Sequence, residues 1–154
     1  MLILSIILVI LFLIKQYIFE MFLMRRLYKA KYTALNEVER RGFINHHIAG
    51  MTKALILVVA VYPFIDVAFR TATLQTKYAK GSVVTLGDIL VVSAQMLVGM
   101  YIFELIYRVK ISPISTLHHI GTILVAQSAI AISLNLDHEP DATVEFILCT
   151  VWGE

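Results

Sequence analysis

The feature that most constrains this chain is a series of apolar runs, each about 20 residues long, separated by short polar or charged connections. A helix of about 20 mostly apolar residues is long enough to cross the roughly 30 Å of hydrocarbon in a bilayer. Four complete runs cover approximately residues 1–24, 48–69, 86–107 and 113–134. The sequence therefore predicts an all-α fold, a polytopic bundle of transmembrane helices.

A fifth apolar run begins at Ala142 and reaches only Glu154. A run of this length is too short to cross a bilayer, so we expect the chain to be a fragment or a truncated gene model whose missing part completes the bundle. The first run has no basic stretch before it and no cleavage pattern after it, and is interpreted as an uncleaved anchor. We therefore divide the chain into an anchor with a basic loop, residues 1–35, and a partial transmembrane domain, residues 36–154.

Composition agrees with a membrane location. The chain is 59% apolar and 16% charged, whereas soluble domains are about 45–50% apolar and about 25% charged. Its 13 basic and 11 acidic residues are too balanced for a protein that neutralises nucleic-acid phosphates. A single cysteine without metal-ligand spacing predicts neither an internal disulfide nor a metal site. Membrane lipids are the expected partners, with homo-oligomerisation left open.

Basic residues predict the orientation of the spans, because Lys and Arg are retained on the cytosolic side during insertion. The connection after the first span carries six of them, and the connection after the third carries Arg108 and Lys110. Loops 25–47 and 108–112 are therefore predicted to be cytosolic.

Ionisable residues within the spans are functional candidates, because each costs a few kcal/mol on insertion scales. The third span carries Glu104, and the fourth carries the adjacent pair His118 and His119. These two spans are joined by about five residues, so they are expected to be antiparallel neighbours. Counted from the loop, Glu104 and His118 lie at a similar depth, roughly 8 Å in at 1.5 Å per residue.

A histidine at this depth suits acid–base chemistry. Neutral imidazole can take a proton from an attacking amine or hydroxyl, or accept an acyl group, and a carboxylate can fix its tautomer. We therefore assign His118 and His119 as catalytic candidates and Glu104 as the residue that orients them. The alternatives are hydrogen bonding of the histidines within the bundle and an ion pair between Glu104 and Arg108.

Other polar and small residues are assigned from their positions. Candidate substrate-binding residues are His46, His47, Tyr101 and Arg108. A solvated interfacial location is the alternative for His46 and His47, and interface packing is the alternative for Tyr101. The remaining expectations are interhelical hydrogen bonds for Gln95 and Gln127, an Asp66–Arg70 ion pair, and close helix approaches at Gly99 and Gly121.

Several segments resemble the TLC domain, which translocating-chain-associated membrane proteins, ceramide synthases and related lipid proteins share. The centre of that domain is similar to YIFELIYR at 101–108, ISP at 111–113 and LHHIG at 117–121, and its usual opening is similar to RRGFINHH at 40–47. The resemblance covers about residues 36–154. His119 is not followed by the tyrosine, arginine and acidic run of the ceramide synthase signature, so a less characterised, fungal branch fits better.

The resemblance implies a helical bundle in the endoplasmic reticulum or a related membrane. In ceramide synthases it also implies transfer of an acyl chain from acyl-CoA to a sphingoid-base amine, and His118 and His119 match the paired histidine that those enzymes need. Two functions are expected to compete: acyl transfer to a lipid amine or hydroxyl with acyl-CoA as co-substrate, and a non-catalytic role in lipid binding or membrane-lipid homeostasis.

Overall fold

The structure is a computed structural model that describes residues 2–133. Its elements are α1 (Leu2–Leu13), the π-helix η1 (Ile14–Leu23), α2 (Met24–Thr33), α3 (Glu37–Phe69), α4 (Leu86–Tyr107) and α5 (Pro113–Ser133). Four helical stretches of this part of the chain are long and apolar enough to cross a membrane: Leu2–Thr33, Glu37–Phe69, Leu86–Tyr107 and Pro113–Ser133. The predicted all-α membrane bundle is confirmed.

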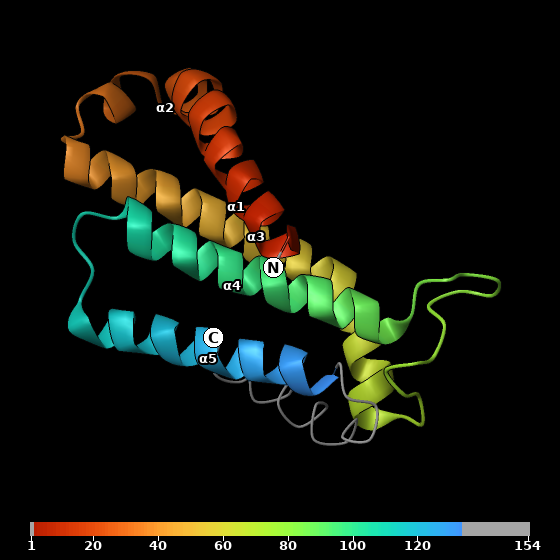
Figure 1. The fold of residues 1–154 in the computed structure, drawn as a ribbon. Coiled ribbons are helices and arrows are strands. Elements are labelled where there is room, and N and C mark those ends of the chain that lie inside the picture. The colour runs from red at the N-terminus through yellow and green to blue at the C-terminus, as the bar shows by residue number, and fades with distance from the viewer. Residues whose placement is uncertain (1, 134–154) are drawn as a thin grey trace.

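Helix α4 is the centre of the bundle. It contacts α1, α3 and α5, and Figure 1 shows it between α3 and α5. It begins with a capping box, in which Thr85 Oγ1 accepts a hydrogen bond from the Asp88 N–H and the Asp88 carboxylate accepts one from the Thr85 N–H. Its predicted bounds, 86–107, are confirmed, because the apolar run and this N-terminal cap signal coincide.

One close approach explains how the first helix packs on α4. A Cβ atom added to Gly99 of α4 would lie 2.7 Å from Cγ2 of Ile7 on α1. Real Cβ atoms do not come that close, so the backbone of α4 leaves room for α1 only because residue 99 has no side chain. The prediction that Gly99 marks a helix approach is confirmed.

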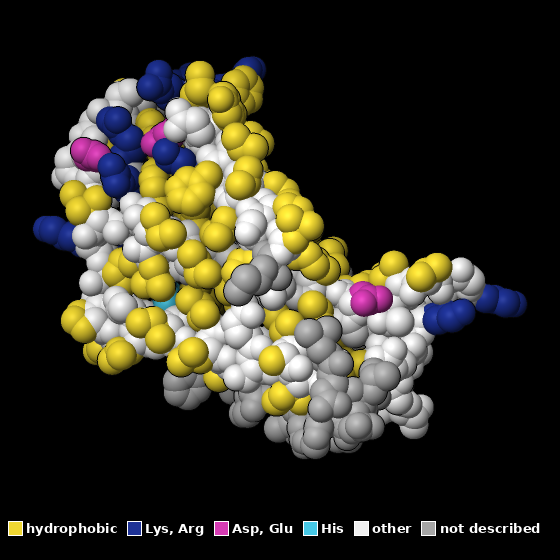
Figure 2. All heavy atoms as spheres, viewed as in Figure 1, with side chains coloured by type: hydrophobic (Ala, Val, Ile, Leu, Met, Phe, Trp, Pro, Cys, Tyr) yellow, Lys and Arg dark blue, Asp and Glu magenta, His cyan; other side chains and the backbone are white. Residues whose placement is uncertain are grey.

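The outer surfaces of α1, α3 and α5 are apolar. On α3, for example, Leu57 and Val58 are 66% and 75% exposed. Figure 2 shows hydrophobic side chains over the middle of the molecule, with Lys and Arg gathered over α2 and the start of α3 and at the far end of the α3–α4 connection. This distribution suits a protein whose middle faces lipid and whose ends face water.

The expected loop at 25–47 is wrong in most of its length. The helical path continues past Arg25 and Arg26 to Thr33, with a break at Lys29 (φ 43°, ψ −124°), and α3 already begins at Glu37. Asn36 caps α3 through a reciprocal capping box with Glu39. Arg and Glu are good helix formers, so charge ends a membrane segment without ending the helix.

The two basic connections lie at the same end of the bundle. Figure 1 shows the α2–α3 connection and the α4–α5 connection at one end and the α3–α4 connection at the other. This arrangement agrees with the alternation of spans that the sequence predicts. The fifth apolar run at 142–154 and the acidic link 137–141 lie outside the described residues.

Candidate functional site

The short α4–α5 connection positions the site. Its last residue, Ser112, caps α5: the Ser115 N–H donates to Ser112 Oγ at 3.1 Å. Pro113 is the first helical residue, where its missing N–H costs no hydrogen bond. The two helices are therefore antiparallel neighbours, and the last turn of α4 lies beside the early turns of α5.

Across this interface a carboxylate meets an imidazole. Glu104 Oε2 lies 3.5 Å from His119 Nε2. Both residues are buried, with 8% of Glu104 and 7% of His119 exposed. The structure thus brings together two of the three residues that the sequence singles out for chemistry.

The same carboxylate has two further partners. Arg108 donates a hydrogen bond from Nη1 to Glu104 Oε1 at 2.7 Å, and the side chain of Asn45 on α3 also hydrogen-bonds the carboxylate. Asn45 is 4% exposed. We call the group formed by Asn45, Glu104, Arg108 and His119 the buried carboxylate site. It joins α3, α4 and α5 at one level.

The ion-pair alternative for Glu104 therefore coexists with the imidazole contact, because each carboxylate oxygen takes a different partner. Arg108 lies against this carboxylate rather than in an open binding surface. Asn45 was not among the residues that the sequence indicated. The signal for Asn45 would be a polar amide on the face of α3 that packs against Glu104. Recognising it requires knowing which face of α3 meets α4.

The ring of His119 is packed but incompletely hydrogen-bonded. It stacks on Tyr101 of α4, with ring centroids 4.4 Å apart and an interplanar angle of 24°. Neither ring nitrogen has a hydrogen-bond partner among the described residues. A buried polar atom without a partner costs about 1–3 kcal/mol, so the two ring nitrogens of His119 are places for a water molecule, an ion or a ligand to bind.

His118 has a different setting. It is half-buried, its ring centre lies 5.6 Å from that of His119, and its ring meets Tyr101 edge-on at 6.0 Å. Tyr101, assigned from the sequence to substrate binding, thus lies against both histidines. It is itself 2% exposed, so its ring forms a wall of the site.

The other histidine pair belongs to another part of the molecule. His47 Nδ1 donates to the Phe43 carbonyl at 2.9 Å, which leaves Nε2 to accept from the Tyr28 hydroxyl at 3.0 Å. The hydrogen bond between His47 and Tyr28 holds α2 against α3. His46 is exposed. Both residues lie inside α3 rather than before it, and His47 is committed to these contacts.

Two remaining expectations have outcomes. Gln127 Nε2 donates to Gln95 Oε1 at 3.5 Å, which confirms an interhelical hydrogen bond. Arg70 pairs with Asp66 at 3.1 Å, as predicted. Within residues 2–133 no group of three or more His, Cys, Asp or Glu side chains is arranged to hold a metal ion. Glu145, the polar residue of the fifth run, lies outside the described residues.

Comparison with known proteins finds no match to a family model, to a curated protein or to a solved structure. The resemblance to the TLC domain therefore stays a prediction.

Proposed function

We propose that this protein is a multi-pass enzyme of lipid metabolism that transfers an acyl chain to a lipid amine or hydroxyl, with acyl-CoA as donor and His119 as the base. The observation that carries the proposal is the buried contact between Glu104 and His119, together with Nδ1 of the His119 ring, which has no hydrogen-bond partner among the described residues. The resemblance to the TLC domain supports the same chemistry.

The proposed step follows from this arrangement. Glu104, whose Oε2 lies 3.5 Å from Nε2, favours the tautomer that carries its proton on Nε2, which leaves the lone pair of Nδ1 available. Nδ1 takes the proton of the acceptor amine or hydroxyl while that group attacks the acyl carbonyl carbon. The carbon–sulfur bond then breaks, and the departing thiolate takes the proton from the imidazolium. Arg108 and Asn45 keep Glu104 in place.

The proposal includes a location. The basic end of the bundle faces the cytosol, in keeping with the retention of Lys and Arg, and the membrane is that of the endoplasmic reticulum, as the resemblance implies. The buried carboxylate site then lies near the cytosolic surface, where a soluble co-substrate can arrive while the acyl chain stays in lipid.

A lipid analysis tests the proposal. Full-length protein carrying His119→Asn, a polar substitution of smaller volume, is compared with wild type and with the matched variant His118→Asn at equal protein level. We expect His119→Asn to lose the lipid product and His118→Asn to retain more of it. An unchanged lipid profile in His119→Asn, and in the double variant, would remove the enzyme proposal. Rescue of a deletion phenotype by the double variant would favour the non-catalytic lipid-binding role.

Glu104 has a positioning role, which a kinetic comparison separates from a structural one. For Glu104→Gln we expect a lower kcat at unchanged KM for the acceptor lipid. If Glu104 were only structural, the variant would reduce the amount of folded protein and leave kcat per folded molecule unchanged.

A further inference from the structure

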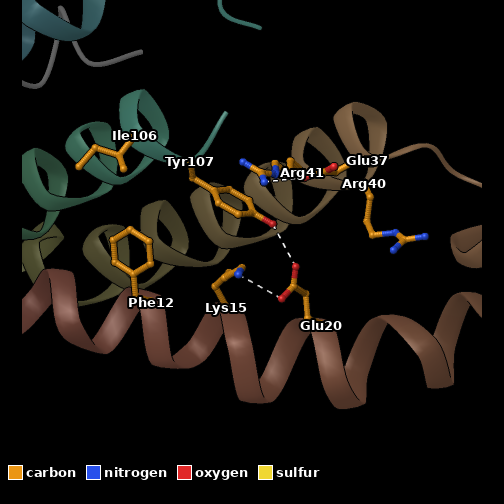
Figure 3. Close-up of a pocket in the computed structure, with 8 residues that line it drawn as sticks. All are labelled: Phe12, Lys15, Glu20, Glu37, Arg40, Arg41, Ile106 and Tyr107. Atoms are coloured by element: carbon orange, nitrogen blue, oxygen red, sulfur yellow. Dashed lines mark hydrogen bonds and ion pairs between the residues drawn. The ribbon is translucent and has the colours of Figure 1, made fainter. Parts of the chain in front are cut away.

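A second polar region lies one helical turn away from the buried carboxylate site. A pocket of about 520 Å³ opens between η1, α3 and α4, and Figure 3 shows the side chains that line it. We call its polar lining the cationic pocket: Lys15, Glu20, Glu37, Arg40, Arg41 and Tyr107. Neither Glu104 nor either histidine of α5 lines it. It is a separate site of the same bundle.

The π-helix makes this pocket. Residues five apart lie about 140° apart around an α-helix, but in a π-helix, where hydrogen bonds join residues five apart, they lie nearly above one another. Lys15 and Glu20 are five apart in η1, and Lys15 Nζ lies 3.1 Å from Glu20 Oε2. Glu20 Oε1 lies 3.5 Å from the Tyr107 hydroxyl of α4. The irregular helix therefore turns both charges toward α4.

The charges of the pocket favour an anion. Three basic side chains and two acidic ones, Glu20 and Glu37, line it, which leaves one net positive charge. Both acids already have basic partners, Lys15 and Arg41 respectively. Arg40 donates from Nη2 to the Leu35 carbonyl at 3.3 Å, but its buried Nε has no hydrogen-bond partner among the described residues. The unmet group is thus a donor on a guanidinium, which suits phosphate oxygens.

The position of the pocket favours an anion attached to a lipid. Helix α3 has 33 residues, about 50 Å at 1.5 Å per residue, so it exceeds the roughly 30 Å of hydrocarbon and its charged first turns reach the head-group layer. At the other end of the pocket lie Phe12 and Ile106, which are 37% and 64% exposed on the apolar surface. Figure 3 shows these two residues at the end away from Arg40.

We propose that the cationic pocket binds the phosphodiester head group of an anionic phospholipid. The phosphate lies against Arg40, with Lys15 and Arg41 beside it, and an acyl chain leaves over Phe12 and Ile106 into the bilayer. A phosphodiester carries one negative charge, which matches the net charge of the lining. The exposed basic residues of α2, Arg25, Arg26, Lys29 and Lys31, attract anionic lipid to the same end. The inference does not depend on acyl transfer.

The test measures binding of phosphatidylglycerol to the full-length protein, by titration in phosphatidylcholine nanodiscs. Arg40→Gln is compared with Arg26→Gln, which removes the same charge from an exposed residue outside the pocket. We expect about tenfold weaker binding for Arg40→Gln, the effect of losing a charge-assisted hydrogen bond, and less than twofold for Arg26→Gln. Equal losses in the two variants would show diffuse attraction and overturn the proposal.

Three further measurements complete the design. Arg40→Lys keeps the charge and the helix but loses Nε–H, so it should weaken binding several-fold while Arg26→Lys does not; equal behaviour would overturn the proposal even if Arg40→Gln fails to fold. Inorganic phosphate distinguishes the sources of the anion. If it displaces bound phosphatidylglycerol at millimolar concentration, the site is one for free phosphate and the lipid assignment is wrong. His119→Asn should bind phosphatidylglycerol normally, which separates this result from the acyl-transfer test.

Discussion

The buried carboxylate site and the cationic pocket use similar side chains in opposite ways. In the first, a single carboxylate has a side chain that is 10% exposed, and it takes partners from α3, from α5 and from Arg108, the residue that caps α4. In the second, the acid and base side chains Glu20 and Lys15 remain 29% and 17% exposed and border an open volume of about 520 Å³. The carboxylate and the imidazole of the first region are shielded from solvent, whereas the second region is open to it.

This difference separates what each region can do. A carboxylate shielded from water acts strongly on a neighbouring imidazole, because the effective dielectric constant around it is low. Partly exposed charges interact weakly with one another, so they can exchange partners when a ligand arrives. This difference supports the two proposals, in which the buried carboxylate site carries out acyl transfer and the cationic pocket binds a lipid head group.

The largest expected effect contrasts the two acids. Glu104→Leu leaves the Asn45 amide and the His119 ring buried without their partner, which should cost about 2–4 kcal/mol of unfolding free energy. Glu20→Leu removes an acid from a partly exposed pair and should cost less than about 1 kcal/mol. The measurement is unfolding of each variant in mixed micelles, followed by circular dichroism. Equal losses would mean that the two regions do not differ in solvent exclusion.

The second prediction concerns a variant that should disturb the cationic pocket and leave the buried carboxylate site in place. Gly99→Leu forces α1 away from α4, because a Cβ there would already lie 2.7 Å from Ile7. Overpacking of this kind costs about 1–3 kcal/mol. Helix α1 leads directly into η1, which carries Lys15, so phosphatidylglycerol binding should weaken several-fold.

The matched control for that prediction is Gly50→Leu on α3, where an added Cβ meets nothing within 4 Å. It should leave both stability and lipid binding nearly unchanged. Unfolding free energy and the phosphatidylglycerol titration check both variants. If Gly99→Leu abolished the lipid product but not phosphatidylglycerol binding, α1 would serve the buried carboxylate site instead of the pocket.

Local signals explain how much of the buried carboxylate site the sequence could predict. The apolar run 86–107 and the Ser112–Pro113 start signal define α4 and α5, and the short link between them forces an antiparallel pair. Glu104 and the histidines are then brought to one level by counting residues. Asn45 could not be placed in this way, because its position depends on the contact between α3 and α4.

The cationic pocket could not be predicted from the sequence, for two physical reasons. Glu20 and Tyr107, which meet in it, are 87 residues apart, and no local pattern reports a contact between such distant segments. In addition, Lys15 and Glu20 would point in different directions on an ordinary α-helix. Their ion pair can therefore be predicted only once the π-helix is known. Residues 25–47 were misplaced for a different reason: their charge suggested a loop, although Asn36 and Glu39 form a local capping box that starts a helix.

The smallest expected effect is the coupling energy between Gln95 and Gln127, with which the coupling between Glu104 and His119 can be compared. Gln95 and Gln127 join the same two helices as Glu104 and His119, but their hydrogen bond is 3.5 Å long and carries no charge. In a double-mutant cycle with Leu at both positions, we expect a coupling energy of about 0.6 kcal/mol, the average for interhelical hydrogen bonds in a bilayer.

The corresponding cycle with Glu104→Gln and His119→Asn should give a larger coupling, because one partner is ionised and both are buried. If the coupling energy of the glutamine pair were the larger of the two, Glu104 would interact with Arg108 and Asn45 but not appreciably with His119. The imidazole would then have no carboxylate to orient it, and the distinction between a chemical region and a recognition region would lose its basis.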